Sequence, residues 1–234
     1  MNNLPTGKIE VRLLSEAIFA SGEKESHLVH SRALTDRYGF VYFHAKSLKG
    51  QLKKQAFWLL DRYRSLDMEK AGHFLKSIER LFGLNGNERE LHWPESKERH
   101  ASQGIMRLSA LELPAAVKND FLQMMKDDEE EEYYALSIHD LIAAQTYIRS
   151  GIELENGTAK DKSLTTYHTV REGLVFYASV SFESMPLQED LDNLDRIVRS
   201  LDRIGAGIHR GYGEVEARLF LNGGRNEHDS IPGY

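Results

Sequence analysis

Apolar and polar residues alternate along three stretches of the chain, Lys8–Leu14, Leu174–Phe182 and Val215–Leu221. A period of two residues is typical of a β-strand that buries one face, because successive side chains point to opposite sides. The pattern therefore predicts one strand near the start of the sequence and two near its end.

Apolar residues at intervals of three and four predict three long helices. The first begins near Ser47, which we expect to be its N-cap. The second covers Met68–Leu81 and ends at Gly83, and the third covers Leu187–Ile204 and ends at Gly205. Glycine is favoured at helix ends because it adopts a left-handed backbone conformation without a steric penalty.

The middle of the chain gives weaker signals. Leu84–Gln103 has the composition of an irregular polar insertion, Ile105–Leu113 predicts a strand, and Pro114–Lys126 predicts a short helix. These segments separate the first two long helices from the rest of the chain.

Two local motifs follow this middle part. Ser137–Arg149 predicts a helix, since Ser137 and Asp140 have the spacing of a capping box. Ile148–Val170 predicts a β-hairpin, because the Asn-Gly pair at 156–157 is the dipeptide that two-residue hairpin turns favour.

Without the middle insertions, the order of elements is strand, helix, strand, strand, helix, strand. This βαββαβ order is that of the ferredoxin-like (RRM-like) fold, so the sequence predicts an α+β core with a helical insertion and a β-hairpin insertion. We expect one domain over residues 1–221, insertions at about 64–103 and 114–170, and a C-terminal tail over 222–234. The fold serves many functions and decides none by itself.

Composition narrows the classes of function. The chain has no cysteine, which excludes disulfides, thiolate metal sites and a cysteine nucleophile. Its first residues contain no long apolar run, so we expect no signal peptide, no membrane span and a cytoplasmic location.

The formal net charge of −6 argues at first against nucleic acid as a partner. However, Asp127–Glu132 holds six acids, and without them 30 acids face 30 lysines and arginines. The remaining chain is balanced, which allows one basic face. The acidic run is either a solvated loop or a negative surface that keeps nucleic acid off the wrong face.

Four glycines fall within Gly205–Gly213, between the last predicted helix and the last predicted strand. Such a loop can turn several main-chain N–H groups toward an anion, and Arg210 adds a forked cationic donor that suits phosphate. The glycine spacing, and the strand that follows, differ from a dinucleotide-binding motif. The alternative is a glycine-rich connector without a ligand.

Lysines gather where the first long helix begins, in the segment KSLKG at 46–50. Free N–H groups and the helix dipole favour anions at a helix N-terminus. Lys46, Lys49 and Lys53 lie along one side of the helix and can follow a sugar-phosphate backbone. The alternative is a solvated basic face.

Together these segments resemble the RAMP superfamily, and in particular the backbone subunits of type III CRISPR effector complexes. The family has a glycine-rich loop before its last strand, which IGAGIHRGYGEVEARL at 204–219 resembles. It also has a lysine-glycine helix start after an extended segment, here within HLVHSRALTDRYGFVYFHAKSLKGQLKKQA at 27–56. Two shorter landmarks, LFG at 81–83 and IMRLSALELP at 105–114, come in the same order, and 148–183 resembles the family's thumb hairpin with its following strand.

The resemblance runs over about residues 7–221 and is weak over 84–103 and 114–134. It implies a subunit that holds guide RNA by its backbone and inserts its hairpin between guide and target RNA, which flips a base at regular intervals. It also implies other CRISPR effector subunits as partners, with repeated copies of this chain or of related subunits along the guide. The implied RNA contacts are Lys46, Ser47, Lys49, Gly50, Lys53, Gly205, Gly207, His209, Arg210, Gly211 and Tyr212.

One position departs from the family pattern. Members that cut target RNA carry an aspartate in the extended segment before the helix, and His30 occupies that position here. Imidazole is a poor ligand for Mg²⁺, which prefers oxygen. We therefore expect binding without target cleavage and no cofactor, with Mg²⁺ required only if cleavage occurs. Asp36 is an alternative carboxylate, although an aspartate before Arg37-Tyr38-Gly39 is more typical of a turn.

Two other functions stay open on the sequence. The first is an endoribonuclease that cuts target RNA or processes the guide precursor, since His27, His30, His44 and His209 can converge for metal-free cleavage and related RAMP endonucleases use histidine. A further alternative for the His27 and His30 pair is half of a metal site, although two histidines on a loop are a weak signal. The second is a ferredoxin-like interaction module that binds no RNA.

Overall fold

The computed structural model describes residues 4–20, 32–94, 101–127, 137–155 and 158–222. Its centre is a six-stranded sheet in the order β2-β4-β7-β1-β8, with β3 also paired to β7 and every pair antiparallel. The strands are β1 (Thr6–Leu13), β2 (Tyr42–Phe43), β3 (Met106–Leu108), β4 (Leu111–Glu112), β7 (Val175–Phe182) and β8 (Val215–Asn222).

The strand order identifies the fold. β8 lies beside β1, β1 beside β7, and β7 beside the short strands β3 and β4. If the strands of the core are numbered in chain order, with β3 and β4 together as the second, their order across the sheet is fourth, first, third, second. The long helices α1 (Ala45–Leu66) and α6 (Gln188–Arg199) lie in the two crossover connections. This is the ferredoxin-like βαββαβ arrangement, and the predicted fold class is confirmed.

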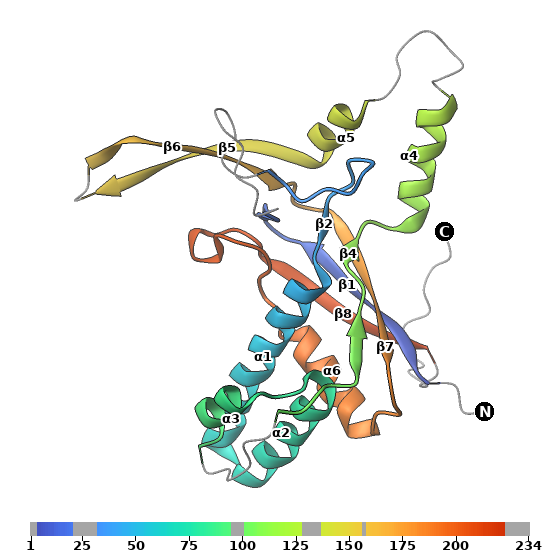
Figure 1. The fold of residues 1–234 in the computed structure, drawn as a ribbon, viewed down its shortest axis with the longest axis vertical. Coiled ribbons are helices and arrows are strands. Elements are labelled where there is room, and N and C mark those ends of the chain that lie inside the picture. Colours follow the sequence, from blue (N-terminus) through green and yellow to red (C-terminus); the bar gives the residue numbers. More distant parts are fainter. Residues whose placement is uncertain (1–3, 21–31, 95–100, 128–136, 156–157, 223–234) are drawn as a thin grey trace.

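Buried and exposed side chains alternate along β1, so one face of this strand lies in the core. Ile9, Val11 and Leu13 expose 1% of their surface or less, while the residues between them face outward. The helices α1, α6 and α2 (Met68–Phe82) pack on one another and reach β3 and β8, and Figure 1 shows them gathered at one end of an elongated molecule. Burying a side chain of this size contributes about 1.5–3 kcal/mol, so the apolar stripes found in the sequence supply most of the driving force.

A buried ion pair fixes α6 to α2. The carboxylate of Asp190, which is fully buried, accepts from Arg80 Nε at 2.9 Å and from Arg80 Nη2 at 2.6 Å. The same carboxylate accepts from the main-chain N–H of Leu187, which closes the first turn of α6. Beside it, Asn193 donates to Ser77 Oγ at 3.0 Å.

The predicted hairpin is present as β5 (Thr146–Glu155) and β6 (Thr158–Val170), paired from Thr146 opposite Val170 outward. It projects from the end of the molecule that is remote from the helical layer (Figure 1). The Asn-Gly turn at 156–157 lies outside the described residues. The remaining helices are α3 (Gly86–His92), α4 (Ala115–Asp127), α5 (Ile138–Gln145) and the 3₁₀ turn η1 (Ile208–Arg210).

Two predicted boundaries of the long helices were wrong. α1 begins at Ala45, with extended His44 as its N-cap, so Ser47 lies in the first turn and caps nothing. α6 ends at Arg199, well before Gly205, yet Leu201 and Ile204 beyond it stay buried, which is why the helical pattern ran on.

The predicted strand at 105–113 is instead two short strands, β3 and β4, which both pair with β7. The segment expected to be irregular contains α3, whose capping box joins Asn85 and Glu88. The capping box at Ser137 and Asp140 is confirmed, but its helix ends at Gln145 and the strand β5 begins at Thr146. At this end of the helix the Gln145 side chain accepts from Val41 N–H and donates to Gly39 O, each at 2.9 Å, which ties α5 to the segment before β2.

No helix among the described residues has the length and apolar character needed to cross a membrane.

Candidate nucleic-acid interface

The glycine loop at 205–213 is held open by left-handed backbone conformations. Gly205, Gly207, Gly211 and Gly213 all have φ between 71° and 87°. Two of them are also required by packing, because a Cβ on Gly205 would lie 2.6 Å from Ile18 O and one on Gly213 would lie 1.9 Å from Ile204 O. The loop shape is therefore dictated by the core beneath it as well as by any ligand.

Part of the expected amide cradle is used within the chain. The main-chain N–H of Ala206 donates to Ile18 O at 2.9 Å and that of Gly213 donates to Glu16 O at 2.8 Å. The N–H of Arg210 closes the 3₁₀ turn on Gly207 O at 2.8 Å. The Arg210 and His209 side chains are exposed, so the loop offers charge and ring atoms to solvent more than free amides.

The lysines that open α1 differ in their surroundings. Lys46 is exposed, as are Ser47 and Gly50. Lys49 instead donates to Met106 O at 2.8 Å, and burial, with Arg107 and Lys53 nearby, lowers its pKa.

Lys53 is likewise directed into the chain and away from solvent. Its Nζ lies 2.6 Å from Glu88 Oε2, with side chains 19% and 28% exposed. Of the predicted lysine contacts, Lys46 is thus the one that reaches solvent without a described bond of this kind. The predictions for Lys49 and Lys53 stay untested as RNA contacts, and their geometry favours a role within the chain.

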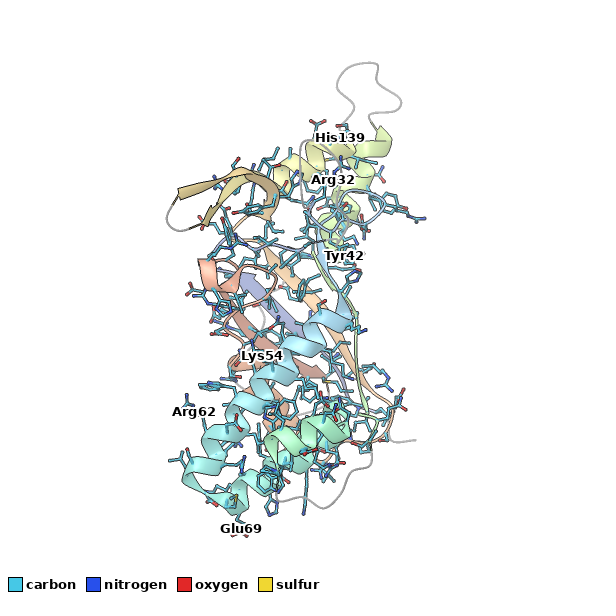
Figure 2. The ribbon with its side chains drawn as sticks, turned by 60° about the vertical axis from the view of Figure 1, so that its left-hand side comes forward. Arg32, Tyr42, Lys54, Arg62, Glu69 and His139 are labelled. Carbon is cyan, nitrogen blue, oxygen red and sulfur yellow. The ribbon has the colours of Figure 1, made fainter. Side chains whose placement is uncertain are left out.

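The sequence analysis missed an exposed stripe on α1. Lys54, Trp58 and Arg62 recur every four residues on the solvent side, with Trp58 50% exposed and the Arg62 guanidinium 5.1 Å from its ring centroid. Figure 2 shows Lys54 and Arg62 projecting outward from α1. Gln55, next to Lys54, donates to Asp202 Oδ1 at 2.9 Å, which ties this side of the helix to the start of the glycine loop. The sequence does contain a signal for this stripe, because positions 54, 58 and 62 lie on the side of the helix opposite the buried leucines.

The base of the hairpin adds aromatic and cationic side chains that the sequence analysis also missed. Tyr147 is 38% exposed, with the Arg149 and Arg171 guanidinium carbons 4.9 and 4.1 Å from its ring centroid. The Arg149 side chain is 45% exposed. Strand alternation places Tyr147 and Arg149 on one face, and their cross-strand partners include Tyr167.

Hairpin and glycine loop touch each other directly. The hydroxyls of Tyr167 and Tyr212 lie 3.2 Å apart, and the two rings meet edge to face at 6.0 Å. Figure 1 shows the loop beneath the hairpin, on the side toward which the hairpin projects. The hydrogen bond with Tyr167, together with burial, raises the pKa of Tyr212, so its hydroxyl stays protonated at neutral pH. Aromatic rings and guanidinium groups in this arrangement can stack on bases and bind phosphates.

Asp36 has the surroundings of a turn-forming residue. Its Oδ1 accepts from the main-chain N–H of Tyr38 at 2.9 Å and of Phe40 at 3.1 Å. Its other oxygen lies 3.1 Å from Lys118 Nζ, which also lies 3.0 Å from Glu112. Both oxygens are thus engaged within the chain, which supports the turn interpretation of this aspartate.

The histidines predicted for catalysis are only partly visible. His27 and His30 lie outside the described residues. His44 caps α1 and stacks edge to face on Tyr42, while His209 is exposed in the glycine loop. Within the described part of the chain, no cluster of three histidines or carboxylates is placed to hold a metal ion.

His168 is a histidine that sequence reasoning overlooked. It lies at the hairpin base, opposite Ile148, and its ring Nδ1 is buried without a hydrogen-bond partner among the described residues. Burial, aided by the charge of Arg32, lowers the pKa of His168. The ring is therefore neutral near pH 7.

The chain resembles known proteins in its sequence pattern and in its fold. The sequence model of a family described as the RAMP superfamily matches residues 10–216. No curated protein matches the chain significantly.

Several solved structures share the fold at low sequence identity. A chain of the type III-B Cmr-beta complex in its apo state is 12% identical, with a TM-score of 0.58, covering 92% of this chain and 96% of the other. A chain from the same kind of complex bound to cognate target RNA is 13% identical, with the same TM-score and coverage. A chain of a type IV-B CRISPR complex is 10% identical, with a TM-score of 0.53, covering 98% and 95%.

Proposed function

Because the chain belongs to the RAMP superfamily, we propose that it is a guide-RNA-binding backbone subunit of a CRISPR effector complex, of the type III kind. Its partners on this proposal are guide RNA, target RNA, other effector subunits and further copies of itself or of related subunits. The structures with the same fold come from multi-subunit CRISPR complexes, one of them bound to target RNA, which supports the proposal.

The observation that carries the proposal is the contact between hairpin and glycine loop. Through Tyr167 and Tyr212 it joins two segments far apart in sequence, and it places the hairpin base, which carries Tyr147 and Arg149, beside the loop that carries Arg210. Phosphates bind guanidinium groups, and bases stack on tyrosine rings, without regard to sequence. A guide-holding subunit needs contacts of this kind.

The proposed RNA contacts differ in whether they reach solvent or shape the surface from within the chain. Those that reach solvent include Lys46, His209 and Arg210 from the sequence-based set, and Lys54 and Arg149 from the structure. Gly205, Gly207, Gly211 and Tyr212 shape the loop that carries them, and Ser47 and Gly50 leave the start of α1 accessible. Lys49 and Lys53 shape the same region from within the chain.

Binding of single-stranded RNA tests the proposal. Arg210→Gln and Lys54→Gln should each weaken binding about fivefold, equivalent to about 1 kcal/mol. Each should also reduce the slope of log affinity against log salt by about 0.7, the loss of one phosphate contact. Lys76→Gln, an exposed lysine on α2, is the matched control and should change neither value. Equal affinity of all three variants and the wild type would count against RNA binding at this surface.

The RNA that copurifies with the chain tests the identity of the ligand. Sequencing should return repeat-derived guide RNA. Protein with a protein-like ratio of absorbance at 260 and 280 nm, and without RNA affinity, would favour the plain interaction module instead.

We also propose that the chain binds target RNA without cutting it, since His30 replaces the expected aspartate and both oxygens of Asp36 are engaged. A complex assembled with guide and labelled target should leave the target intact in Mg²⁺ and in EDTA. His30→Asp is the informative comparison, because cleavage by that variant alone identifies a scaffold that lacks only its carboxylate. Cleavage by the wild type would overturn this part of the proposal.

A further inference from the structure

The segment after β1 runs between the hairpin base and the glycine loop. On one side, Ala17 exchanges two main-chain hydrogen bonds with Val170 of β6, at 3.0 and 2.7 Å. On the other side, Glu16 O accepts from the N–H of Gly213 at 2.8 Å. Residues 15–18 are therefore the seam along which hairpin and loop are joined.

The Glu16 side chain crosses from this seam to the hairpin. Its Oε2 accepts from Arg149 Nε at 2.9 Å and from Thr169 Oγ1 at 2.6 Å, while its Oε1 pairs with Arg149 Nη2. The Glu16 side chain is 19% exposed and that of Arg149 is 45% exposed. The hydrogen bonds from Arg149 hold the pKa of Glu16 below its usual range, so the carboxylate stays ionised at neutral pH.

A carboxylate at this place is unexpected if it only faces RNA, because it repels phosphate. Simple electrostatics predicts that removing its charge strengthens RNA binding. The bidentate contact suggests another use, because it fixes both the plane of the Arg149 guanidinium and the position of the strand that carries it. Thr169, on the partner strand β6, extends the same restraint across the hairpin.

We propose that Glu16 is a positioning residue for RNA binding: it orients the Arg149 guanidinium and holds the hairpin base against the glycine loop in the geometry that RNA requires. The inference rests on the proposed function and names a part of it that neither the family match nor the related structures assign. Glu16 itself makes no contact with RNA on this account and acts through Arg149.

Glu16→Gln separates positioning from electrostatics, since the two ideas predict opposite signs. Positioning predicts that affinity for single-stranded RNA falls about tenfold, within the range of coupling between contacting groups. Electrostatics alone predicts unchanged or tighter binding. Glu90→Gln is the control, because it removes the same charge from an exposed position on α3. Glu16→Asp, which keeps the charge and shortens the reach, should fall between wild type and Glu16→Gln.

A double-mutant cycle identifies the route of the effect. If Glu16 acts through Arg149, Glu16→Gln should cost nothing further in an Arg149→Gln background. Additive losses in the double variant would overturn the inference, as would tighter binding by Glu16→Gln. If Glu16→Gln fails to fold, Thr169→Val is a second test of the same idea. It removes only the hydroxyl donor to Glu16 and should also weaken RNA binding.

The inference and the proposed function fail in different ways. Wild-type protein that binds no RNA, or an Arg149→Gln variant that binds as well as wild type, contradicts the RNA surface itself. Normal wild-type binding, weakened by Arg149→Gln but not by Glu16→Gln, leaves the surface intact and removes the role of Glu16.

Discussion

Four lysines near the start of α1 show how far residue type alone determines a role. Lys46 and Lys54 are exposed, whereas Lys49 donates to the main chain of β3 and Lys53 pairs with Glu88 of α3. The difference follows from helical geometry, because positions 49 and 53 flank the buried leucines and position 54 lies on the opposite side. The sequence identified the basic helix start, but neighbours supplied by distant segments decided which lysines reach solvent.

Lys49→Met should therefore affect stability more than RNA binding. The Met106 carbonyl loses its charged donor, so the free energy of unfolding should fall by about 1 kcal/mol in urea denaturation. RNA affinity should stay within twofold of the wild type, in contrast to Lys54→Gln. A loss of affinity as large as that of Lys54→Gln would restore Lys49 as a phosphate contact.

Asp190→Asn tests the buried ion pair between α2 and α6. The variant leaves Arg80 without its carboxylate partner and weakens the closure of the first turn of α6. We expect the free energy of unfolding to fall by about 3 kcal/mol, at the lower end for a broken buried pair, because the Arg80 side chain is 34% exposed and reaches water. Asp192→Asn, on the exposed side of α6, is the control and should change stability by less than about 0.5 kcal/mol.

His168 gives the chain a pH dependence with a defined sign. Its folded-state pKa lies below the ordinary value of 6.5, so the unfolded state binds more protons between the two pKa values. Stability should therefore fall as the pH drops below 6.5, and His168→Gln should flatten that part of the profile. Thermal unfolding of both proteins between pH 5 and 7.5 measures the difference, and parallel curves would contradict the assignment.

At the scale of elements, the sequence pattern predicted whether a segment is a helix or a strand better than it predicted where the segment ends. The helices α1, α2 and α6, the strands β1, β7 and β8 and the hairpin were all expected, since periodicity reports which face is buried. The end of α6 was missed because Leu201 and Ile204, which lie beyond the helix, are buried at positions that continue its apolar spacing. The helix α3 was missed although Asn85 and Glu88 carry the same capping signal that correctly located α5.

The glycines of the loop at 205–213 are needed for different reasons, some for close packing and others only for their left-handed backbone conformation. Gly213→Ala places a Cβ 1.9 Å from Ile204 O, so the loop must shift, and we expect a loss of more than about 3 kcal/mol of stability. The Cβ of Gly211→Ala meets open space, so only the left-handed backbone conformation destabilises this variant, by about 1–2 kcal/mol. Unfolding of the two variants in urea gives the comparison, and equal losses would show that backbone conformation, not packing, sets the requirement.

At the scale of the whole molecule, the candidate surface is assembled from segments that the sequence keeps apart. The sequence pointed to α1, the glycine loop and the hairpin as separate features, and the sheet order places loop and hairpin together through residues 15–18. Periodicity reports the face of each element but not its neighbours. Glu16, Tyr147 and Arg149 could therefore not be identified without the tertiary structure.

A surface built from guanidinium groups, lysines and tyrosine rings predicts recognition without base identity. Nuclease protection with two guides of unrelated sequence and equal length should give footprints of the same size and spacing. A footprint that moves with the sequence would indicate base-specific contacts that this surface does not provide.

Arg149, Tyr167, Thr169 and Val170 lie at the base of the hairpin and join it to the rest of the chain. Beyond that base the two strands continue away from the sheet (Figure 1). A force on the outer part of the hairpin reaches the core through the contacts at its base. Because Tyr167 contacts Tyr212, bending of the hairpin should also shift the glycine loop that carries Arg210.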